Sequence, residues 1–352
     1  MGEILGLGLT HYPLLSKYDE NMPAILHSML KNPRLPEQLR DPSGWPAPMR
    51  EEYGDDRGTT AARKHREACV NELRVLRKAL DDFNPDFVVI WGDDQYENFK
   101  EDVIPAFCVG IYDTVSTQPW KGKGGEENIW DEPKETTIVN KGHKAGGKAL
   151  AAGLLREGFD ISYAYKPAHY EGIPHAFLNS VLFLDYDRKG FNYPIVPFQV
   201  NCYGRHVIAQ KGGLPSFDRE PLKEEDLDPP APSPKRCMEI GAATARVLKD
   251  SPYRVALIAS SSWSHAFLTA KNHFLYPDIE KDRQMYDALV HGDFDTWRSM
   301  TLEEIEESGQ QEILNWSCLM GAMEELGRKT PTSSAFVETY VLNSSKTFAI
   351  YR

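Results

Sequence analysis

Three hydrophobic segments of the chain end abruptly in polar residues. Residues 88–91 are wholly apolar and stop in an acidic turn, residues 4–9 run into His11, and residues 255–259 lead on to His265. Short apolar runs bounded by turn residues are typical of sheet strands that are covered on both faces. Open α/β sheets place their ligand sites just beyond the carboxyl ends of such strands. The pattern therefore predicts one polar site built from three strand ends.

Helical and extended patterns alternate along most of the chain. Amphipathic or Ala-rich patterns predict helices at 23–31, 59–83, 142–157, 234–249, 278–291 and 302–327. Strands are predicted at 3–10, 88–91, 103–110, 161–165, 194–200 and 254–260, with a terminal hairpin over 335–351. This alternation predicts a single α/β domain with a central, mostly parallel or mixed sheet flanked by helices and a site at the strand carboxyl ends.

Two long excursions interrupt this order, at about 32–58 and 210–234, and both are rich in proline and charge. Loops of this length inside a compact domain are usually lids, interface arms or disordered segments, so we expect these two to shape a pocket mouth or a subunit contact. A third polar segment, 113–140, contains Gly122, Gly124 and Gly125. These glycines have no strand–helix context and do not predict a phosphate-binding loop.

Composition narrows the function classes. The formal net charge of −12 argues against a surface for nucleic acid or anionic membranes. The five cysteines are scattered and never spaced as C-x-x-C, which favours reduced thiols in a cytoplasmic protein. No apolar run approaches the ~20 residues of a membrane helix, and Glu3 interrupts the beginning of any signal peptide.

Four of the ten histidines stand out because each follows a hydrophobic segment at a strand end or sharp turn. They are His11, His175, His206 and His265. The motifs G-x-S-x-G, G-x-G-x-x-G, H-E-x-x-H and the Walker loop do not occur where they would be diagnostic. What remains is histidine and carboxylate chemistry, which suits non-haem Fe(II) and equally permits zinc or manganese.

Several blocks of the chain resemble the type III extradiol ring-cleavage dioxygenases, the group that contains the catalytic subunit of protocatechuate 4,5-dioxygenase and the dihydroxyphenylpropionate dioxygenases. The resemblance is carried, in family order, by residues 9–14 (LTHYPL), 85–99 (PDFVVIWGDDQYENF), 104–107 (IPAF), 173–177 (IPHAF), 196–201 (VPFQVN), 262–265 (SWSH) and 280–282 (EKD). No single block is decisive, but the ordered set is specific.

The resemblance implies one α/β domain that holds Fe(II), or another divalent metal, with two histidines and one glutamate. By motif, His11 is the first metal ligand and Glu280 is the glutamate. His175 matches the acid–base catalyst, and His265 matches a histidine that lines the pocket. His206 lies near a position where some members keep another active-site histidine.

The chain departs from the family at the position of the second metal-binding histidine. The family has Asp-His-x-x-x-Phe there, whereas residues 94–99 contain Gln95 in place of the histidine. No histidine lies between His65 and His143, so a shift of register does not restore one. Gln95 is therefore the expected ligand, with Asp94 or Glu97 as substitutes, although an amide oxygen binds Fe(II) more weakly than imidazole.

The function implied by the resemblance is an Fe(II)-dependent dioxygenase that opens a catecholic or related phenolic ring with O2. One alternative is a relative with an altered or absent metal site that does hydrolase- or lyase-type chemistry on an aromatic compound. The other is a non-catalytic partner subunit. The expected partners are a small aromatic substrate, O2 and further copies of the chain in a homo-oligomer, with no nucleic acid and no membrane.

Overall fold

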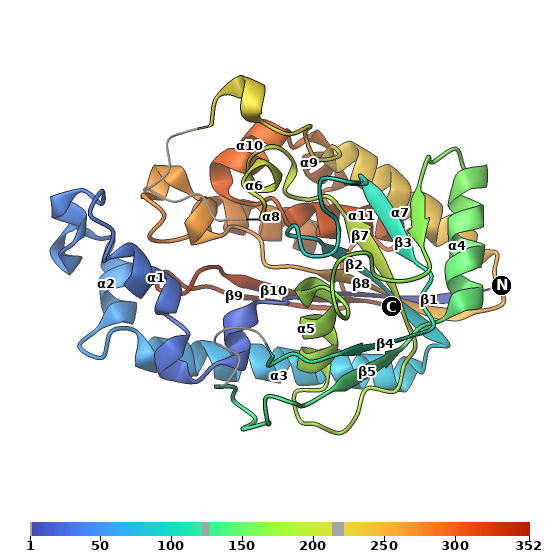
Figure 1. Ribbon diagram of the computed structural model, residues 1–352, viewed down its shortest axis with the longest axis horizontal. Coiled ribbons are helices and arrows are strands. Elements are labelled where there is room, and N and C mark those ends of the chain that lie inside the picture. Colours follow the sequence, from blue (N-terminus) through green and yellow to red (C-terminus); the bar gives the residue numbers. More distant parts are fainter. Residues whose placement is uncertain (1, 122–126, 213–221) are drawn as a thin grey trace.

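An eight-stranded mixed sheet forms the centre of the structure, a computed structural model that describes residues 2–121, 127–212 and 222–352 (Figure 1). The strand order is β6-β3-β7-β2-β8-β1-β10-β9. The strands of this sheet are β1 (Glu3–Leu9), β2 (Phe87–Asp93), β3 (Phe107–Gly110), β6 (Ser162–Ala164), β7 (Ile195–Val200), β8 (Arg254–Ser260), β9 (Ser333–Val337) and β10 (Lys346–Tyr351). Strands β7, β2, β8 and β1 are mutually parallel, whereas β10 and β9 return antiparallel as the predicted terminal hairpin. The α/β prediction is confirmed.

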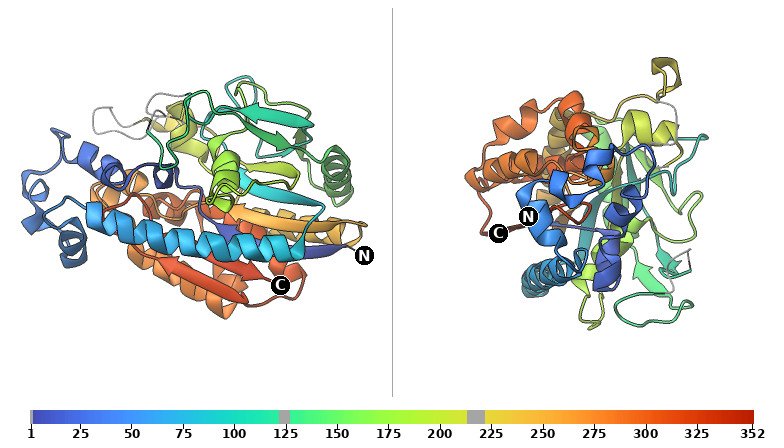
Figure 2. Two further views of the ribbon diagram at one scale, coloured as in Figure 1. Left: turned by 90° about the horizontal axis from the view of Figure 1, so that it is seen from below. Right: turned by 90° about the vertical axis from the view of Figure 1, so that its left-hand side faces the viewer.

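Helices cover both faces of the sheet. They are α1 (Ala24–Met29), α2 (Ala47–Tyr53), α3 (Thr59–Phe83), α4 (Lys144–Arg156), α5 (His175–Leu184), α6 (Gly204–Ala209), α7 (Pro234–Lys249), α8 (Ile279–His291), α9 (Phe294–Ser299), α10 (Leu302–Ser308) and α11 (Ile313–Glu325). Helices α3 and α5 pack on one face, where α3 runs lengthwise (Figure 2), and α4, α7 and α11 pack on the other. Alternate residues of β2 enter the two cores: Val88 and Ile90 enter one, and Val89 and Trp91 the other. This explains why the strand is apolar at every position.

Helices α7 and α11 approach closely because each has a glycine at the contact. A Cβ atom added at Gly241 would lie 1.8 Å from the carbonyl oxygen of Cys318. One added at Gly321 would lie 1.9 Å from the carbonyl oxygen of Met238. The close contact fixes the position of α11, which begins immediately after a residue of the site described below.

The predicted helix over 302–327 is two helices. Gly309 adopts φ +70° at the end of α10, a left-handed conformation that favours glycine and stops the helix. Residues 309–312 then form a turn before α11 begins. The segment 113–140, expected to be a loop, contributes two antiparallel strands, β4 (Thr114–Thr117) and β5 (Ile138–Lys141). The three glycines Gly122, Gly124 and Gly125 lie outside the described residues.

The excursion at 32–58 is ordered by a buried tryptophan and a glutamate. Trp45 donates its indole N–H to the carbonyl oxygen of Leu39. One oxygen of Glu52 accepts hydrogen bonds from the hydroxyl of Thr339 and the backbone N–H groups of Tyr340 and Val341. The excursion thus braces the connection between β9 and β10. Of the second excursion, 210–234, residues 213–221 lie outside the described part of the chain.

Among the described residues, no helix combines the length and apolar character needed to cross a membrane.

Candidate active site

The three hydrophobic segments form neighbouring parallel strands. Strand β8 lies between β1 and β2, so the carboxyl ends of the three strands lie at one edge of the sheet. His11 follows β1, Asp93 is the last residue of β2, and Ser260 is the last residue of β8. The predicted convergence of these strand ends is therefore present in the fold, and it brings buried polar side chains together.

The two ring nitrogens of His11 have different surroundings: Nδ1 contacts Ser260, and Nε2 faces the site. Its Nδ1 lies 3.0 Å from the carbonyl oxygen of Ser260 and 3.1 Å from the Oγ of the same residue. A carbonyl oxygen only accepts, so Nδ1 carries the hydrogen and Nε2 of the neutral ring keeps a lone pair. That Nε2 lies 3.3 Å from Glu312 Oε2 and 3.7 Å from Asp93 Oδ1. Burial lowers the pKa of His11, but the attraction of Glu312 and Asp93 outweighs it and raises the pKa overall.

Glu312 enters the site from the turn between α10 and α11. It is buried, and its Oε1 accepts a hydrogen bond from the hydroxyl of Tyr203. Its Oε2 has no hydrogen-bond partner among the described residues, yet it also lies 3.5 Å from His265 Nε2. The Nδ1 of His265 bonds to the carbonyl oxygen of Trp263 at 2.8 Å, so this second imidazole likewise faces Glu312 with a lone pair.

Asp93 is fully buried at the end of β2 and is only partly satisfied. Its Oδ1 lies 3.4 Å from the side-chain amide of Asn315, and its Oδ2 has no partner within the described ranges. Burial, followed by repulsion from Glu312, raises the pKa of Asp93 to about 7. Asp93 therefore lacks sufficient positive charge around it. Burial also disfavours the charge of Glu312, but His265 and His11 outweigh it and lower the pKa of Glu312 to about 2.

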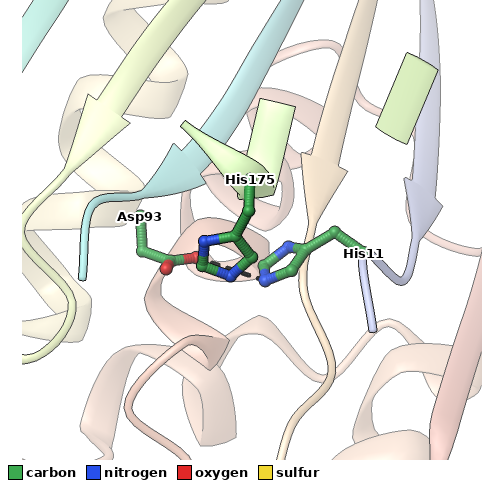
Figure 3. A group of neighbouring side chains, drawn as sticks. All are labelled: His11, Asp93 and His175. Carbon is green, nitrogen blue, oxygen red and sulfur yellow. Dashed lines mark ion pairs between the residues drawn. The ribbon is translucent and has the colours of Figure 1, made fainter. Parts of the chain in front are cut away.

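His175 is the first residue of α5 and meets His11 edge-on, with ring centroids 5.1 Å apart. Its Nδ1 lies 2.8 Å from Glu97 Oε2, and its backbone N–H donates to the same oxygen at 3.2 Å. Because a carboxylate accepts the Nδ1 hydrogen, Nε2 is the nitrogen left free to react or bind. Figure 3 shows His11, Asp93 and His175 pointing toward one another from three different elements.

The turn after β2 explains why Glu97, and not Gln95, reaches the site. The carboxylate of Asp94 accepts hydrogen bonds from the backbone N–H groups of Glu97 and Asn98, which folds the turn back on itself. Tyr96 adopts φ +58° within this turn. The side-chain amide of Gln95 turns away and donates to the carbonyl oxygen of Gly212 at 3.2 Å. Glu97 takes the inward position.

The predicted site residues therefore separate into two groups. The structure brings together His11, His175 and His265. Glu280 is exposed near the start of α8, and His206 is exposed on α6, where it pairs with Glu306 at 3.6 Å. Gln95 and Asp94 belong to the turn rather than to the group around His11.

Sequence reasoning did not select Asp93 or Glu312. Asp93 stands beside Asp94 and was not distinguished from it. Glu312 falls inside the predicted helix 302–327 and so did not stand out as a site residue. Gly309 and the polar residues after it are a signal that the helix stops there.

The arrangement fits a divalent metal ion. Within the described residues, His11, Asp93 and His175 form a group whose candidate ligand atoms all lie within 4.8 Å of one another, and Glu312 adjoins it. The orphaned oxygens of Asp93 and Glu312 are what a cation would satisfy. Each of the three imidazoles is oriented through Nδ1 by an oxygen acceptor, which is how metal-binding histidines are usually held. Imidazole with carboxylate ligands suits Fe(II) and other first-row divalent metals.

Comparisons with known proteins find similarity to aromatic ring-opening dioxygenases. The family model of the catalytic LigB subunit of aromatic ring-opening dioxygenases matches residues 227–348, the part that contains His265 and Glu312. A 2,3-dihydroxyphenylpropionate/2,3-dihydroxicinnamic acid 1,2-dioxygenase from Photorhabdus laumondii is 24% identical over 193 residues, which are 55% of this chain and 47% of the relative. A relative of the same name, numbered 2, from Pseudomonas putida is 25% identical over 194 residues, 55% of this chain and 48% of its own length. The relative from Paraburkholderia phymatum is 27% identical over 192 residues, 54% of this chain and 47% of its own length.

The chain spans about half the length of these curated relatives. The family match covers the carboxyl-terminal third of the chain, and the ordered blocks that resemble the family extend from residue 9 to residue 282. Together they support the resemblance of the chain to the type III extradiol ring-cleavage dioxygenases.

Proposed function

We propose that this protein is a non-haem Fe(II)-dependent dioxygenase that opens a catecholic or related phenolic ring and places both atoms of O2 in the product. The single observation that carries the proposal is the group of three oriented imidazoles and two partly unsatisfied carboxylates at the ends of β1, β2 and β8. The resemblance to ring-opening dioxygenases supports the proposed reaction class.

In the proposed site, His11, Asp93 and Glu312 hold the metal. These residues replace the expected set of His11, Gln95 and Glu280. The reason is geometric: Nε2 of His11 has both carboxylates within 3.7 Å, whereas Gln95 bonds to Gly212. Fe(II) held by these residues would supply redox chemistry between a catechol ring and O2.

His175 is the proposed acid–base residue. A catechol must lose its phenolic protons before its ring can be oxidised, and a neutral imidazole is suited to take one and return it. Glu97 holds the Nδ1 hydrogen of His175, so Nε2 is the atom that exchanges the proton. Burial lowers the pKa of His175, but the attraction of Glu97, Asp93 and Glu312 outweighs it and raises the pKa to about 10. A cation bound by Asp93 and Glu312 would offset part of that attraction and favour the neutral ring that this role requires. In this proposal His175 transfers protons, whereas His11, which faces both carboxylates, binds the metal.

His265 is proposed to line the pocket beside Glu312. Its ring is buried and its Nδ1 donates to the carbonyl oxygen of Trp263, so its Nε2 can accept a hydrogen bond from a substrate hydroxyl. His206 has no such role in this proposal, because its exposed ring lies with Glu306 on α6 and α10. The expected homo-oligomer is retained as part of the proposal.

The experiment is oxygen uptake by protein loaded anaerobically with Fe(II), on a panel of catechols that includes 2,3-dihydroxyphenylpropionate, the compound in the relatives' names. The proposal predicts uptake of one O2 per ring opened and a yellow ring-fission product. Activity on the same panel by protein stripped of metal would contradict it and would favour hydrolase- or lyase-type chemistry. The absence of turnover with a fully loaded site would favour a non-catalytic subunit.

A further inference from the structure

Asp282 joins two segments of the chain that carry site residues. It lies on α8, is fully buried, and accepts two hydrogen bonds at a single oxygen, Oδ1. The backbone N–H of Ser264 donates at 3.0 Å, and the side-chain amide of Gln310 donates at 2.6 Å. His265 directly follows Ser264, and Glu312 lies two residues after Gln310. The carboxyl group of Asp282 therefore contacts both segments one or two residues before His265 and Glu312, whose side chains face each other at 3.5 Å.

Further hydrogen bonds connect the same three segments. The hydroxyl of Ser264 donates to the carbonyl oxygen of Ser308 at 2.6 Å and accepts from the backbone N–H of Asp278 at 2.7 Å. The backbone N–H of His265 donates to the carbonyl oxygen of Gly309 at 2.9 Å. The start of α8, the segment around His265 and the turn before Glu312 therefore form one network with Asp282 inside it.

The segments that carry His265 and Glu312 need these hydrogen bonds because neither residue lies within a helix or strand of the sheet. His265 lies beyond the end of β8, and Glu312 lies in the turn between α10 and α11. Their relative position is therefore set by side-chain hydrogen bonds and by the single backbone bond from His265 to Gly309, rather than by a regular backbone ladder. Asp282 suits this task because one oxygen accepts a hydrogen bond from each segment. Burial raises the pKa of Asp282 to about 7, and the two donors partly offset that rise.

The carboxyl group of Asp282 is only partly paired, so stability alone does not explain its presence. Its second oxygen, Oδ2, is buried without a hydrogen-bond partner among the described residues. A buried carboxyl group with one oxygen left without a partner costs folding free energy. The same helix carries Glu280, the residue that the sequence motif suggested as the metal ligand.

We infer that Asp282 is a positioning residue that sets the separation of Glu312 and His265, so that the 280–282 motif acts on the metal site through Asp282 rather than through a ligand at Glu280. This inference rests on the proposed metal site at Glu312. It assigns to Asp282 a contribution to metal affinity and to metal geometry, without contact to the metal.

The test is an anaerobic titration with Co(II), followed by its visible d–d absorption, on the full chain carrying Asp282→Ala, Asp282→Asn or Gln310→Met. Loss of a group that bonds directly to a metal ligand typically weakens binding by about 10- to 100-fold. Asp282 bonds to neighbours of His265 and Glu312, so for Asp282→Ala we expect the lower end, about 10-fold, together with a changed spectrum. Asp282→Asn, which keeps an oxygen acceptor, should recover most of the affinity. Glu280→Ala, on the same helix and exposed, is the matched control and should bind Co(II) like the wild type.

Unfolding of each metal-free variant, measured in the same buffer, separates affinity from stability. If Asp282→Ala does not fold, Gln310→Met removes one of the two bonds while keeping a side chain of similar length. Wild-type affinity and spectrum in the folded variants would overturn the inference. Glu312→Ala distinguishes the two claims: if it too binds Co(II) like the wild type, the proposed metal site itself is wrong.

Discussion

Replacement of Glu97 tests how His175 is held. In Glu97→Ala the Nδ1 hydrogen of His175 and the backbone N–H of the same residue both lose their acceptor, at present 2.8 and 3.2 Å away. A fully buried donor left without a partner costs about 1–3 kcal/mol. The side chains of His175 and Glu97 are each 22% exposed, so water replaces part of each bond and the two donors together lose about 1–3 kcal/mol of support. Glu97→Gln keeps an oxygen in place and removes only the charge.

We expect kcat to fall by about 100-fold in Glu97→Ala and by about 10-fold in Glu97→Gln, because supporting partners of this kind are worth roughly that range. The assay is oxygen uptake at saturating catechol, with the iron content of each sample measured in parallel. Gln95→Ala is the matched control, since it lies in the same turn but bonds to Gly212. A wild-type kcat in Glu97→Ala at equal iron content would refute the role assigned to the pair.

Three further changes probe the packing, the turn and a buried charge. Gly321→Ala places a methyl group 1.9 Å from the carbonyl oxygen of Met238. This variant should lower the free energy of unfolding, measured in urea, by about 1–3 kcal/mol or more. Gly147→Ala is the control and should not lower it, because its nearest contact would be at 3.4 Å. Gln95→His should leave Co(II) affinity unchanged, because the side chain at this position faces away from His11; a tighter site would show that the turn can reverse. Burial lowers the pKa of Lys346 from 10.5 to about 7, so its charge opposes folding and the free energy of unfolding should rise from pH 7 to pH 10.5. Lys346→Met should be more stable than the wild type at pH 7, and this advantage should shrink across the same interval in pH-dependent denaturation.

The sequence predicts the sheet and its polar edge because short, fully apolar strands are a local signal. Residues 4–9, 88–91 and 255–259 lie in three adjacent strands, and the structure places His11 and His265 beyond the ends of two of them. Local pattern also predicts α3 correctly, since its apolar stripe is continuous over 25 residues.

Glu312 could not be selected in the same way, because its role depends on contacts over long sequence separations. It meets His11, about 300 residues earlier, only after β1 and β8 have paired and α11 has packed on α7. The local signal was the stop at Gly309, followed by a helix that is apolar nearly all round and therefore buried.

Motif alignment placed the family's histidine at Gln95 but could not show how the turn folds. The hydrogen bonds of Asp94 to the backbone of Glu97 and Asn98 decide which side chains point inward. In this chain that turn supplies a carboxylate to His175. Asp93, one residue earlier and still within β2, supplies the carboxylate nearest to His11.

The most direct test of the account is the metal content of single variants after anaerobic loading with Fe(II) and removal of excess metal. We predict about one iron per chain in the wild type, in His175→Ala and in Glu280→Ala, and loss of iron in His11→Ala, Asp93→Ala and Glu312→Ala. Full occupancy in Glu312→Ala combined with loss in Glu280→Ala would contradict the account.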